Sequence, residues 1–197
     1  MSMHFFSSQS LPATPWKNGG GTTQEVVCWP QGAGLDSFEW RISIAQIARS
    51  GPFSAFAGID RVITLLSGDG VHLHSPDGAI NHRLGQALQP FAFSGDVALD
   101  CDLLGGPSYD FNVMTRRGVA HAVVSIHHGG SVQLASPHGL LLARAGQWQL
   151  QGGAALQARA QDGVYWAAHS GAAVEASAAS DDAILIAVAL NKVAIGA

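Results

Sequence analysis

An arginine opens one of the apolar runs of the chain, Arg61–Leu66 (Arg-Val-Ile-Thr-Leu-Leu). Its β-branched and aliphatic residues are typical of a strand, and alternation along a strand puts Arg61 on the same face as Ile63 and Leu65. A guanidinium among buried aliphatic side chains must find an anion or several hydrogen-bond acceptors, because an unpaired buried charge is very costly. Arg61 is therefore a candidate for ligand binding.

A second group of chemically capable residues precedes three glycines, in the sequence Pro-Trp-Lys-Asn-Gly-Gly-Gly-Thr at 15–22. Trp16 offers a stacking face and Lys17 and Asn18 offer donors, while the glycines allow positive φ and a close approach of the backbone. The segment predicts either a loop folded over a ligand or a surface turn. It is not a phosphate-binding loop, because the lysine precedes the glycines and residues 23–29 read as a strand.

Polar side chains also recur at every second residue of expected strands. In the segment 110–117, Asn112, Met114 and Arg116 share one side, a spacing that suits a ligand-lining surface and a solvent face equally well. In the segment 38–45, Arg41 and Ser43 share the polar face, where an arginine more often pairs across strands than contacts a ligand. These two residues and Glu25, which could serve as a general acid or base, are second-tier candidates.

His72 and His74 lie on one side of a short expected strand and could chelate a metal ion together. No third ligand lies at a supportive spacing, so we do not expect a metal site there. His127 and His128 are neighbours on an extended segment, which turns their side chains to opposite faces. We expect neither a metal ion nor an organic cofactor.

The composition limits the classes of function. Charged residues make up 12% of the 197 residues, against about 25% in an average soluble chain, and the net charge of −4 gives no reason to expect nucleic-acid or anionic-lipid binding. Cys28 and Cys101 read as buried thiols of a reducing compartment. The first residues lack the pattern of a signal peptide and no apolar run is long enough to span a membrane, so we expect a cytoplasmic protein.

Short strands separated by turns account for most of the chain. The run at 61–66, the turn Ser-Gly-Asp-Gly at 67–70 and the run at 71–74 predict a β-hairpin. Residues 140–150 align with residues 64–74 at an offset of 76, and the same offset carries Gly95 onto Gly171, which suggests duplication of one β unit. The sequence therefore predicts an all-β sandwich or barrel.

Five motifs occur in a fixed order in the first 120 residues: PWKNGGGTTQE, FEWRIS, GPFSAFAGIDRVITLLSGDG, PFAFSGD and GPSYDFNVMTRR. Together they closely resemble the HutD/Ves family of bacterial cupin-like proteins. The resemblance implies an RmlC-like bicupin fold of two packed β-barrel or jelly-roll units. Residues 1–120 would form an N-terminal unit with a ligand pocket, and residues 121–197 a second, degenerate unit.

The resemblance also bears on metal binding. Metal-binding cupins place a His-x-His pair and a Glu before a hydrophobic run that ends in a glycine turn, and here Arg61 stands in the place of the Glu, with Ser54 and Phe56 in the places of the histidines. A guanidinium repels a cation and a phenyl ring has no lone pair to give. An anionic ligand is therefore expected where the relatives with metal hold an ion.

The family is associated with histidine utilisation, so the resemblance implies a non-enzymatic regulatory protein that binds an anionic intermediate, urocanate or N-formylglutamate. Arg61 would bind a carboxylate and Lys17 a second one, with Trp16 stacking on the ligand. Amide, formyl or imidazole groups would be oriented by polar side chains. The expected ligand-binding residues are Trp16, Lys17, Asn18, Arg61, Thr64, Asn112, Met114 and Arg116.

Two other functions remain open from the sequence. No nucleophile elbow or catalytic cysteine signature is present, but metal-free cupins can host enzymes, so action on a small carboxylate is one alternative. A structural or partner-binding protein is the other, since an Ala- and Gly-rich surface with few charges could be covered in a homodimer. Ligand occupancy would reach transcription by sequestering an inducer or by contact with a transcriptional repressor, without direct contact with nucleic acid.

Overall fold

The computed structural model describes residues 3–157 and 161–193. By its internal contacts the chain forms two compact units. The N-terminal unit covers Pro12–Ala120, and the C-terminal unit combines residues up to Leu11 with those from His121 onward. The second unit therefore includes the first strand, which we had expected in the unit 1–120.

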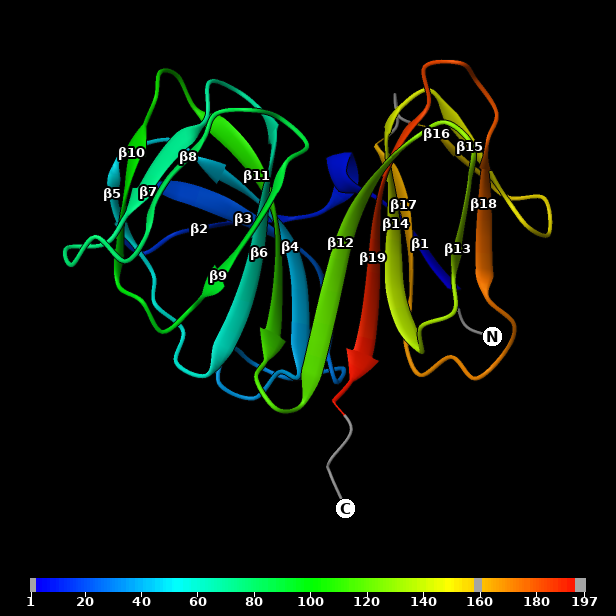
Figure 1. Ribbon diagram of the computed structural model, residues 1–197, viewed down its shortest axis with the longest axis horizontal. Coiled ribbons are helices and arrows are strands. Elements are labelled where there is room, and N and C mark those ends of the chain that lie inside the picture. The colour runs from blue at the N-terminus through cyan, green and yellow to red at the C-terminus, as the bar shows by residue number, and fades with distance from the viewer. Residues whose placement is uncertain (1–2, 158–160, 194–197) are drawn as a thin grey trace. The chain divides into compact units, whose positions relative to one another are not determined.

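The N-terminal unit consists of a six-stranded and a four-stranded sheet (Figure 1). The order in the first sheet is β2-β3-β4-β11-β6-β9, and in the second β5-β10-β7-β8. The strands are β2 (Ala13–Pro15), β3 (Gly21–Trp29), β4 (Trp40–Ile47), β5 (Gly51–Phe53), β6 (Ile59–Ser67), β7 (Val71–His74), β8 (Asn81–Leu84), β9 (Pro90–Ser94), β10 (Leu99–Leu103) and β11 (Ser108–Arg116).

The C-terminal unit has a five-stranded sheet in the order β1-β17-β14-β19-β12 and a four-stranded sheet in the order β13-β18-β15-β16. A short 3₁₀ turn, η1 (Ser8–Ser10), follows its first strand. The strands are β1 (Met3–Ser7), β12 (Ala120–His128), β13 (Ser131–Leu134), β14 (His138–Ala145), β15 (Gln147–Leu150), β16 (Ala155–Gln157), β17 (Asp162–Trp166), β18 (Val174–Ala178) and β19 (Ile184–Lys192). The all-β prediction is confirmed.

The strand order of the N-terminal unit recurs in the C-terminal unit. Strands β9-β6-β11-β4 correspond to β17-β14-β19-β12, and β5-β10-β7-β8 to β13-β18-β15-β16. Residues 147–150 of β15 follow residues 71–74 of β7 by the offset of 76 found in the sequence. The repeated segments thus occupy matching places in two sheets of the same connectivity.

The tight turn between β6 and β7 depends on glycine. Gly70 has a φ of +89°, in the left-handed region, and a Cβ atom at this position would lie 2.2 Å from the carbonyl oxygen of Leu84. Only glycine combines this backbone conformation with so close a neighbouring chain. The turn leads β7 into the other sheet, where it pairs with β10 and β8 and not with β6. The β-hairpin predicted at 61–74 is therefore wrong: the two strands and the turn are present, but the strands are not hydrogen-bonded to each other.

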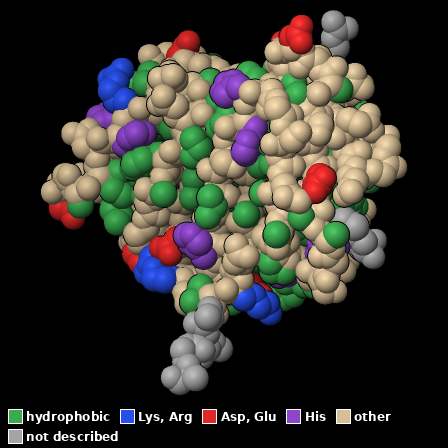
Figure 2. Space-filling model, turned by 45° about the vertical axis from the view of Figure 1, so that its right-hand side comes forward, with side chains coloured by type: hydrophobic (Ala, Val, Ile, Leu, Met, Phe, Trp, Pro, Cys, Tyr) green, Lys and Arg blue, Asp and Glu red, His purple; other side chains and the backbone are tan. Residues whose placement is uncertain are grey.

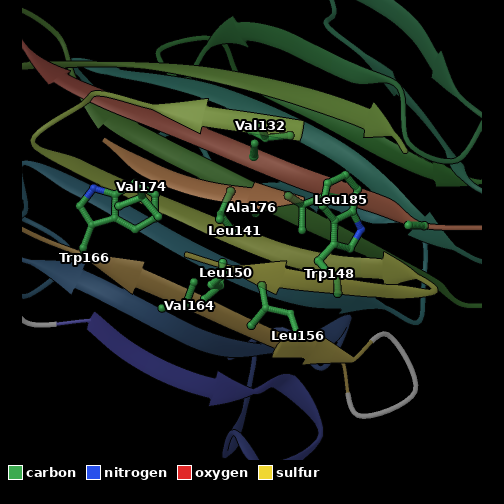
Figure 3. Packing of buried hydrophobic residues seen from close by; sticks show 13 residues of the cluster. Val132, Leu141, Trp148, Leu150, Leu156, Val164, Trp166, Val174, Ala176 and Leu185 are labelled. Carbon is green, nitrogen blue, oxygen red and sulfur yellow. The ribbon is translucent and has the colours of Figure 1, made fainter. Parts of the chain in front are cut away.

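Each unit has its own apolar core between its two sheets. In the N-terminal unit the core includes Ile63 and Leu65 of β6 and Leu73 of β7, as alternation predicts. The core of the C-terminal unit contains two fully buried tryptophans, Trp148 and Trp166, which lie at opposite ends of the cluster (Figure 3).

Within the described residues, no helix is long and apolar enough to cross a membrane.

Candidate functional site

Arg61 lies inside the N-terminal unit, on the face of β6 that also carries Ile63 and Leu65. Its side chain is only 4% exposed. One terminal nitrogen donates a hydrogen bond to the carbonyl oxygen of Ser54 at 3.1 Å. The guanidinium carbon is also 4.5 Å from the ring centroid of Phe53, a cation–π contact that partly offsets the loss of water around the charge.

Ser54 and Phe56 stand where metal-binding cupins have their two metal-ligating histidines, and both contact the Arg61 guanidinium. Ser54 supplies the acceptor just described, and the ring centroid of Phe56 lies 5.4 Å from the guanidinium carbon of Arg61. Phe93, opposite Arg61 on β9, contributes a third ring at 5.2 Å. Three aromatic rings and one carbonyl thus surround the Arg61 cation, at the sequence positions where metal-binding cupins place their metal ligands.

A buried carboxyl group lies on the same interior surface. Asp110 of β11 is 2% exposed and stands opposite Leu65 of β6. Burial raises the pKa of Asp110 to about 7, although the charge of Arg61 partly offsets this shift. Burial likewise lowers the pKa of Arg61 to about 10, opposed by Asp110. At neutral pH the interior therefore holds a charged guanidinium and a carboxyl group close to its titration midpoint.

The adjacent positions of β11 complete what we call the interior polar cluster, defined as Arg61, Asp110, Asn112 and Ser43. Asn112 is 7% exposed and stands opposite Ser43 of β4. Among the described residues, no hydrogen-bond partner is found for the Nε of Arg61, the Oδ2 of Asp110 or the Oδ1 of Asn112. Buried polar atoms are normally satisfied, so this cluster has unused capacity to bind a polar molecule.

Met114 and Arg41 border the cluster. Met114 stands between Arg61 on β6 and Arg41 on β4. The Nε of Arg41 donates to the Oε2 of Glu25 on β3 at 2.7 Å, and one of its terminal nitrogens lies 4.0 Å from the Met114 sulfur. The polar face that the sequence indicated for β4 is therefore an interior face, and its arginine is paired across strands.

A small cavity of about 120 Å³ opens beside the glycine-rich turn between β2 and β3. The ring of Trp16 forms part of its wall, fixed by a 2.7 Å hydrogen bond from the indole nitrogen to the Oγ1 of Thr23. Asn18 also lines it, and its Oδ1 accepts a hydrogen bond from the Gly20 amide. We call this space the Trp16 cavity. The lining residues are Trp16, Asn18, Gly20, Ile47, Arg49, Ser50, Gly51, Pro52, Phe53 and Cys101.

Phe53 connects the Trp16 cavity to the interior polar cluster. Its ring lines the cavity and also contacts the guanidinium of Arg61. At the rim, the exposed side chain of Arg49 offers a second positive charge. Burial, with Asp110 and Asp102 contributing, raises the pKa of the Cys101 thiol to about 12, so that this wall is an uncharged, unreactive sulfur.

Three predicted site residues lie elsewhere. Lys17 is exposed in the turn next to Trp16 and does not line the cavity. Thr64 is fully buried, but alternation along β6 puts it on the face opposite Arg61. Arg116 donates hydrogen bonds to the carbonyl oxygens of Phe38 and Asp36, at 2.8 and 3.0 Å, so its guanidinium fastens the segment before β4.

Sequence reasoning missed Asp110 and Arg49. Asp110 follows the same alternation as Asn112 and Met114, so the pattern that found those two residues could also have found the carboxyl group. Arg49 lies outside any strand, and nothing in its local sequence indicates that it meets the turn at Trp16.

On the face shown in Figure 2, the few Lys and Arg side chains lie apart from one another rather than in a basic patch.

Comparison with known proteins gives a family match along most of the chain. A model of the family described as HutD matches residues 8–185. Protein Ves of Escherichia fergusonii is 42% identical over 149 residues, which cover 75% of this chain and 76% of that protein. An uncharacterized 21.2 kDa protein in the hutC 3′ region of Pseudomonas putida is 47% identical over 115 residues, 57% of each chain.

Solved structures agree with this match. A conserved protein of unknown function from Pseudomonas aeruginosa, PA5104, has a TM-score of 0.85 at 35% identity and covers 97% of this chain and 100% of its own. HutD from Pseudomonas fluorescens SBW25 has a TM-score of 0.83 at 31% identity, with coverage of 98% and 100%. YhhW from Escherichia coli, at 10% identity, covers 95% and 97% with a TM-score of 0.64 and shares the fold alone. The expected cupin-like fold is confirmed.

Proposed function

Because the chain belongs to the HutD family, we propose that it is a small-molecule-binding protein of histidine utilisation whose N-terminal unit binds an anionic intermediate of that pathway. Urocanate and N-formylglutamate are the two candidate ligands. The location of a relative in the hutC 3′ region of Pseudomonas putida supports the association with this pathway. The binding mode that follows rests on the interior of the N-terminal unit.

The observation that carries the proposal is the buried guanidinium of Arg61 beside unsatisfied polar atoms. A carboxylate could accept two hydrogen bonds from a guanidinium, one of them from the Nε that lacks a partner among the described residues. Each hydrogen bond to a charged group contributes roughly 1.5–3 kcal/mol. The unsatisfied Oδ1 of Asn112 would accept a hydrogen bond from an amide or imidazole N–H of the ligand.

The Trp16 cavity provides the route to Arg61. A ligand that enters there meets the Trp16 ring and displaces the ring of Phe53 to reach the guanidinium. A second carboxylate, present in N-formylglutamate and absent from urocanate, would remain near Arg49 at the rim. N-formylglutamate would thus contact both Arg61 and Arg49, whereas urocanate, with one carboxylate, would contact Arg61 alone.

Binding would act on gene expression without catalysis. The protein would either lower the free concentration of a pathway inducer or, when occupied, contact a transcriptional repressor. We favour the first of these because it needs no surface beyond the binding site itself.

Isothermal titration calorimetry with urocanate and N-formylglutamate tests the proposal. Arg61→Met removes the charge and keeps a long side chain, and we expect it to weaken binding of both ligands by at least about tenfold, the loss of roughly 1.4 kcal/mol. Arg49→Met is expected to weaken N-formylglutamate more than urocanate. Arg116→Met is the matched control, since its guanidinium binds carbonyl oxygens outside the interior polar cluster.

Two outcomes would contradict this assignment. If Arg61→Met retains wild-type affinity in a folded preparation, Arg61 is a structural cation and the ligand lies elsewhere. If neither compound binds the wild-type protein, the proposed ligand class is wrong. Circular dichroism of each variant separates loss of binding from loss of folding.

One observation favours a second function, a metal-independent enzyme acting on a small carboxylate. A buried carboxyl group with its pKa raised to about 7 is suited to general acid–base catalysis at neutral pH. Incubation of the protein with each compound, followed by chromatography, would reveal turnover. A product that disappears in Asp110→Asn would replace the binding function by a catalytic one.

A further inference from the structure

We propose that His72, His74 and Asp102 form a binding site for a divalent transition-metal ion, of the class of Zn²⁺, Co²⁺ and Ni²⁺, on the outer face of the four-stranded sheet of the N-terminal unit. The site is separate from the interior polar cluster, because alternation along β7 turns Leu73 inward and both histidines outward. The proposal does not depend on the function suggested above.

The strand register assembles the three side chains. His72 and His74 are two residues apart on β7 and therefore share a face, and Asp102 of β10 stands directly opposite His72. One potential ligand atom from each residue lies within 4.8 Å of the other two. The histidine ring centroids are 5.0 Å apart, and the Nε2 of His74 lies 2.9 Å from the Oδ2 of Asp102.

This spacing is close to that of a metal centre. Ligand atoms at about 2.0–2.1 Å from a tetrahedral ion are separated from one another by about 3.3 Å. Small side-chain rotations would bring the three atoms to that separation. Asp102 and His74 have room to rotate, because the Asp102 side chain is 56% exposed and that of His74 is 34% exposed.

A hollow beside the three residues supplies room for further ligands. The cavity measures about 290 Å³ and is also lined by Ser75, Gly78, Ile80 and Asn81. The Oδ1 of Asn81 already lies 2.6 Å from the Nε2 of His72. Three protein ligands would leave at least one coordination position to water, to a small anion or to this amide oxygen.

The donor set determines the class of metal. Two imidazoles and one carboxylate suit Zn²⁺, Co²⁺ and Ni²⁺, whereas Mg²⁺ and Ca²⁺ prefer oxygen ligands alone and Cu⁺ prefers sulfur. The alternative to a metal site is a simple surface hydrogen bond between His74 and Asp102, which would not require a second histidine nearby. The presence of His72 on the same face, with the adjoining hollow, points to coordination.

The experiment uses the full chain without a histidine tag, stripped with a chelator and titrated with Co²⁺ and Zn²⁺. We expect one ion per chain and visible absorption bands of tetrahedral or five-coordinate Co²⁺. His74→Gln and Asp102→Asn should each weaken binding by at least about tenfold. His128→Gln is the matched control, because it removes a histidine from the other neighbouring pair and should leave the affinity unchanged.

The proposal is overturned if the wild-type protein binds Co²⁺ and Zn²⁺ no more tightly than the double variant His72→Gln/His74→Gln. It is equally overturned if His128→Gln removes the binding. X-ray absorption of the Zn²⁺ complex gives a second readout, with two imidazoles and oxygen donors expected in the first shell. Carboxylate binding measured in the presence of chelator should be unchanged in all these variants.

Discussion

The two units have the same strand order but different interiors. On the paired strands β6 and β11 of the N-terminal unit, Leu65 faces Asp110 and Ile63 faces Asn112. At the positions 76 residues later on β14, the partners on β19 are both alanine: Leu141 faces Ala187 and Gly139 faces Ala189. A carboxyl group and an amide in one unit are thus replaced by methyl groups in the other.

Aromatic packing fills the corresponding space in the C-terminal unit. A Cβ atom on Gly139 would lie 2.3 Å from the ring of Trp166, so glycine makes room for that indole. The Trp166 nitrogen donates to the carbonyl oxygen of Ser136 at 3.1 Å, which leaves no polar group of this side chain unsatisfied. This β unit therefore folds around an apolar core, and the polar interior of its counterpart is not required by the fold.

The largest expected effect comes from emptying the apolar interior. Trp166→Ala should lower the free energy of unfolding by about 3–5 kcal/mol, because it removes a fully buried indole and leaves a cavity. Urea denaturation measures the loss. Carboxylate affinity, measured on the folded fraction, should be unaffected. A variant as stable as the wild type would show that the C-terminal core tolerates a void and would weaken the comparison.

Removal of both charges from the polar interior should have the opposite consequence. Arg61→Met combined with Asp110→Asn is expected to leave the free energy of unfolding unchanged or to raise it, because the desolvation cost of burying the charged groups is removed. The same double variant should no longer bind carboxylates. Urea denaturation and calorimetry test the two statements separately. Marked destabilisation would show that the charges hold the N-terminal unit together.

Titration of Asp110 sharpens the contrast further. Its folded-state pKa of about 7 lies above the ordinary value of 3.8, so the native protein binds an extra proton between these pH values. The contribution of Asp110 to stability is then fully present below about pH 4 and is lost as the pH rises toward 7. Subtracting the pH profile of Asp110→Asn from that of the wild type should give a negative slope in this window.

A flat or positive difference between those profiles would mean that Asp110 is ionised in the folded protein. The subtraction is necessary because burial lowers the pKa of His82 and His127, which changes stability in the opposite direction near pH 6. Carboxylate affinity should also fall above about pH 7, since an ionised Asp110 repels the ligand.

The smallest expected effect concerns a feature that both units share. Gly146 lies 76 residues after Gly70, and both have positive φ. Gly70→Ala should cost about 1–3 kcal/mol, because its Cβ would meet the backbone oxygen of Leu84. Gly146→Ala should cost less, because the two nearest atoms are side-chain oxygens of Ser180 and Asp182, and the nearest backbone atom, the Cα of Ala183, is 2.9 Å away. Thermal denaturation compares the two, and equal losses would exclude the neighbouring atom as the cause.

Local periodicity accounts for the parts of the site that the sequence predicted. Alternation placed Arg61 with Ile63 and Leu65, and it placed Asn112 with Met114, because side chains two residues apart on one strand always point to the same face of the sheet. The same rule puts Thr64 on the other face from Arg61, because the two residues are an odd number of positions apart. The prediction that Thr64 belongs to the same site did not take this into account. Arg116 follows the alternation of β11 but lies at its end, where the carbonyl groups of the preceding loop bind it.

Contacts between distant segments could not be predicted in this way. Asp102 meets His72 only because β10 and β7 pair in one particular register, and no local pattern specifies that register. Arg49 approaches Trp16 because two loops meet at one end of the unit. The strand order of each unit was recoverable only in outline, through the repeat and the family resemblance.

The pairing of β1 has a consequence for biosynthesis. Phe5 pairs with Val164, so this strand must wait for a partner that is translated 159 residues later. At about 5–20 residues per second, the delay amounts to roughly ten to thirty seconds on the ribosome. Before that interval ends, the residues from Pro12 to Ala120 are complete and can fold as a unit, whereas the nascent N-terminal strand remains an unpaired segment that chaperones could bind.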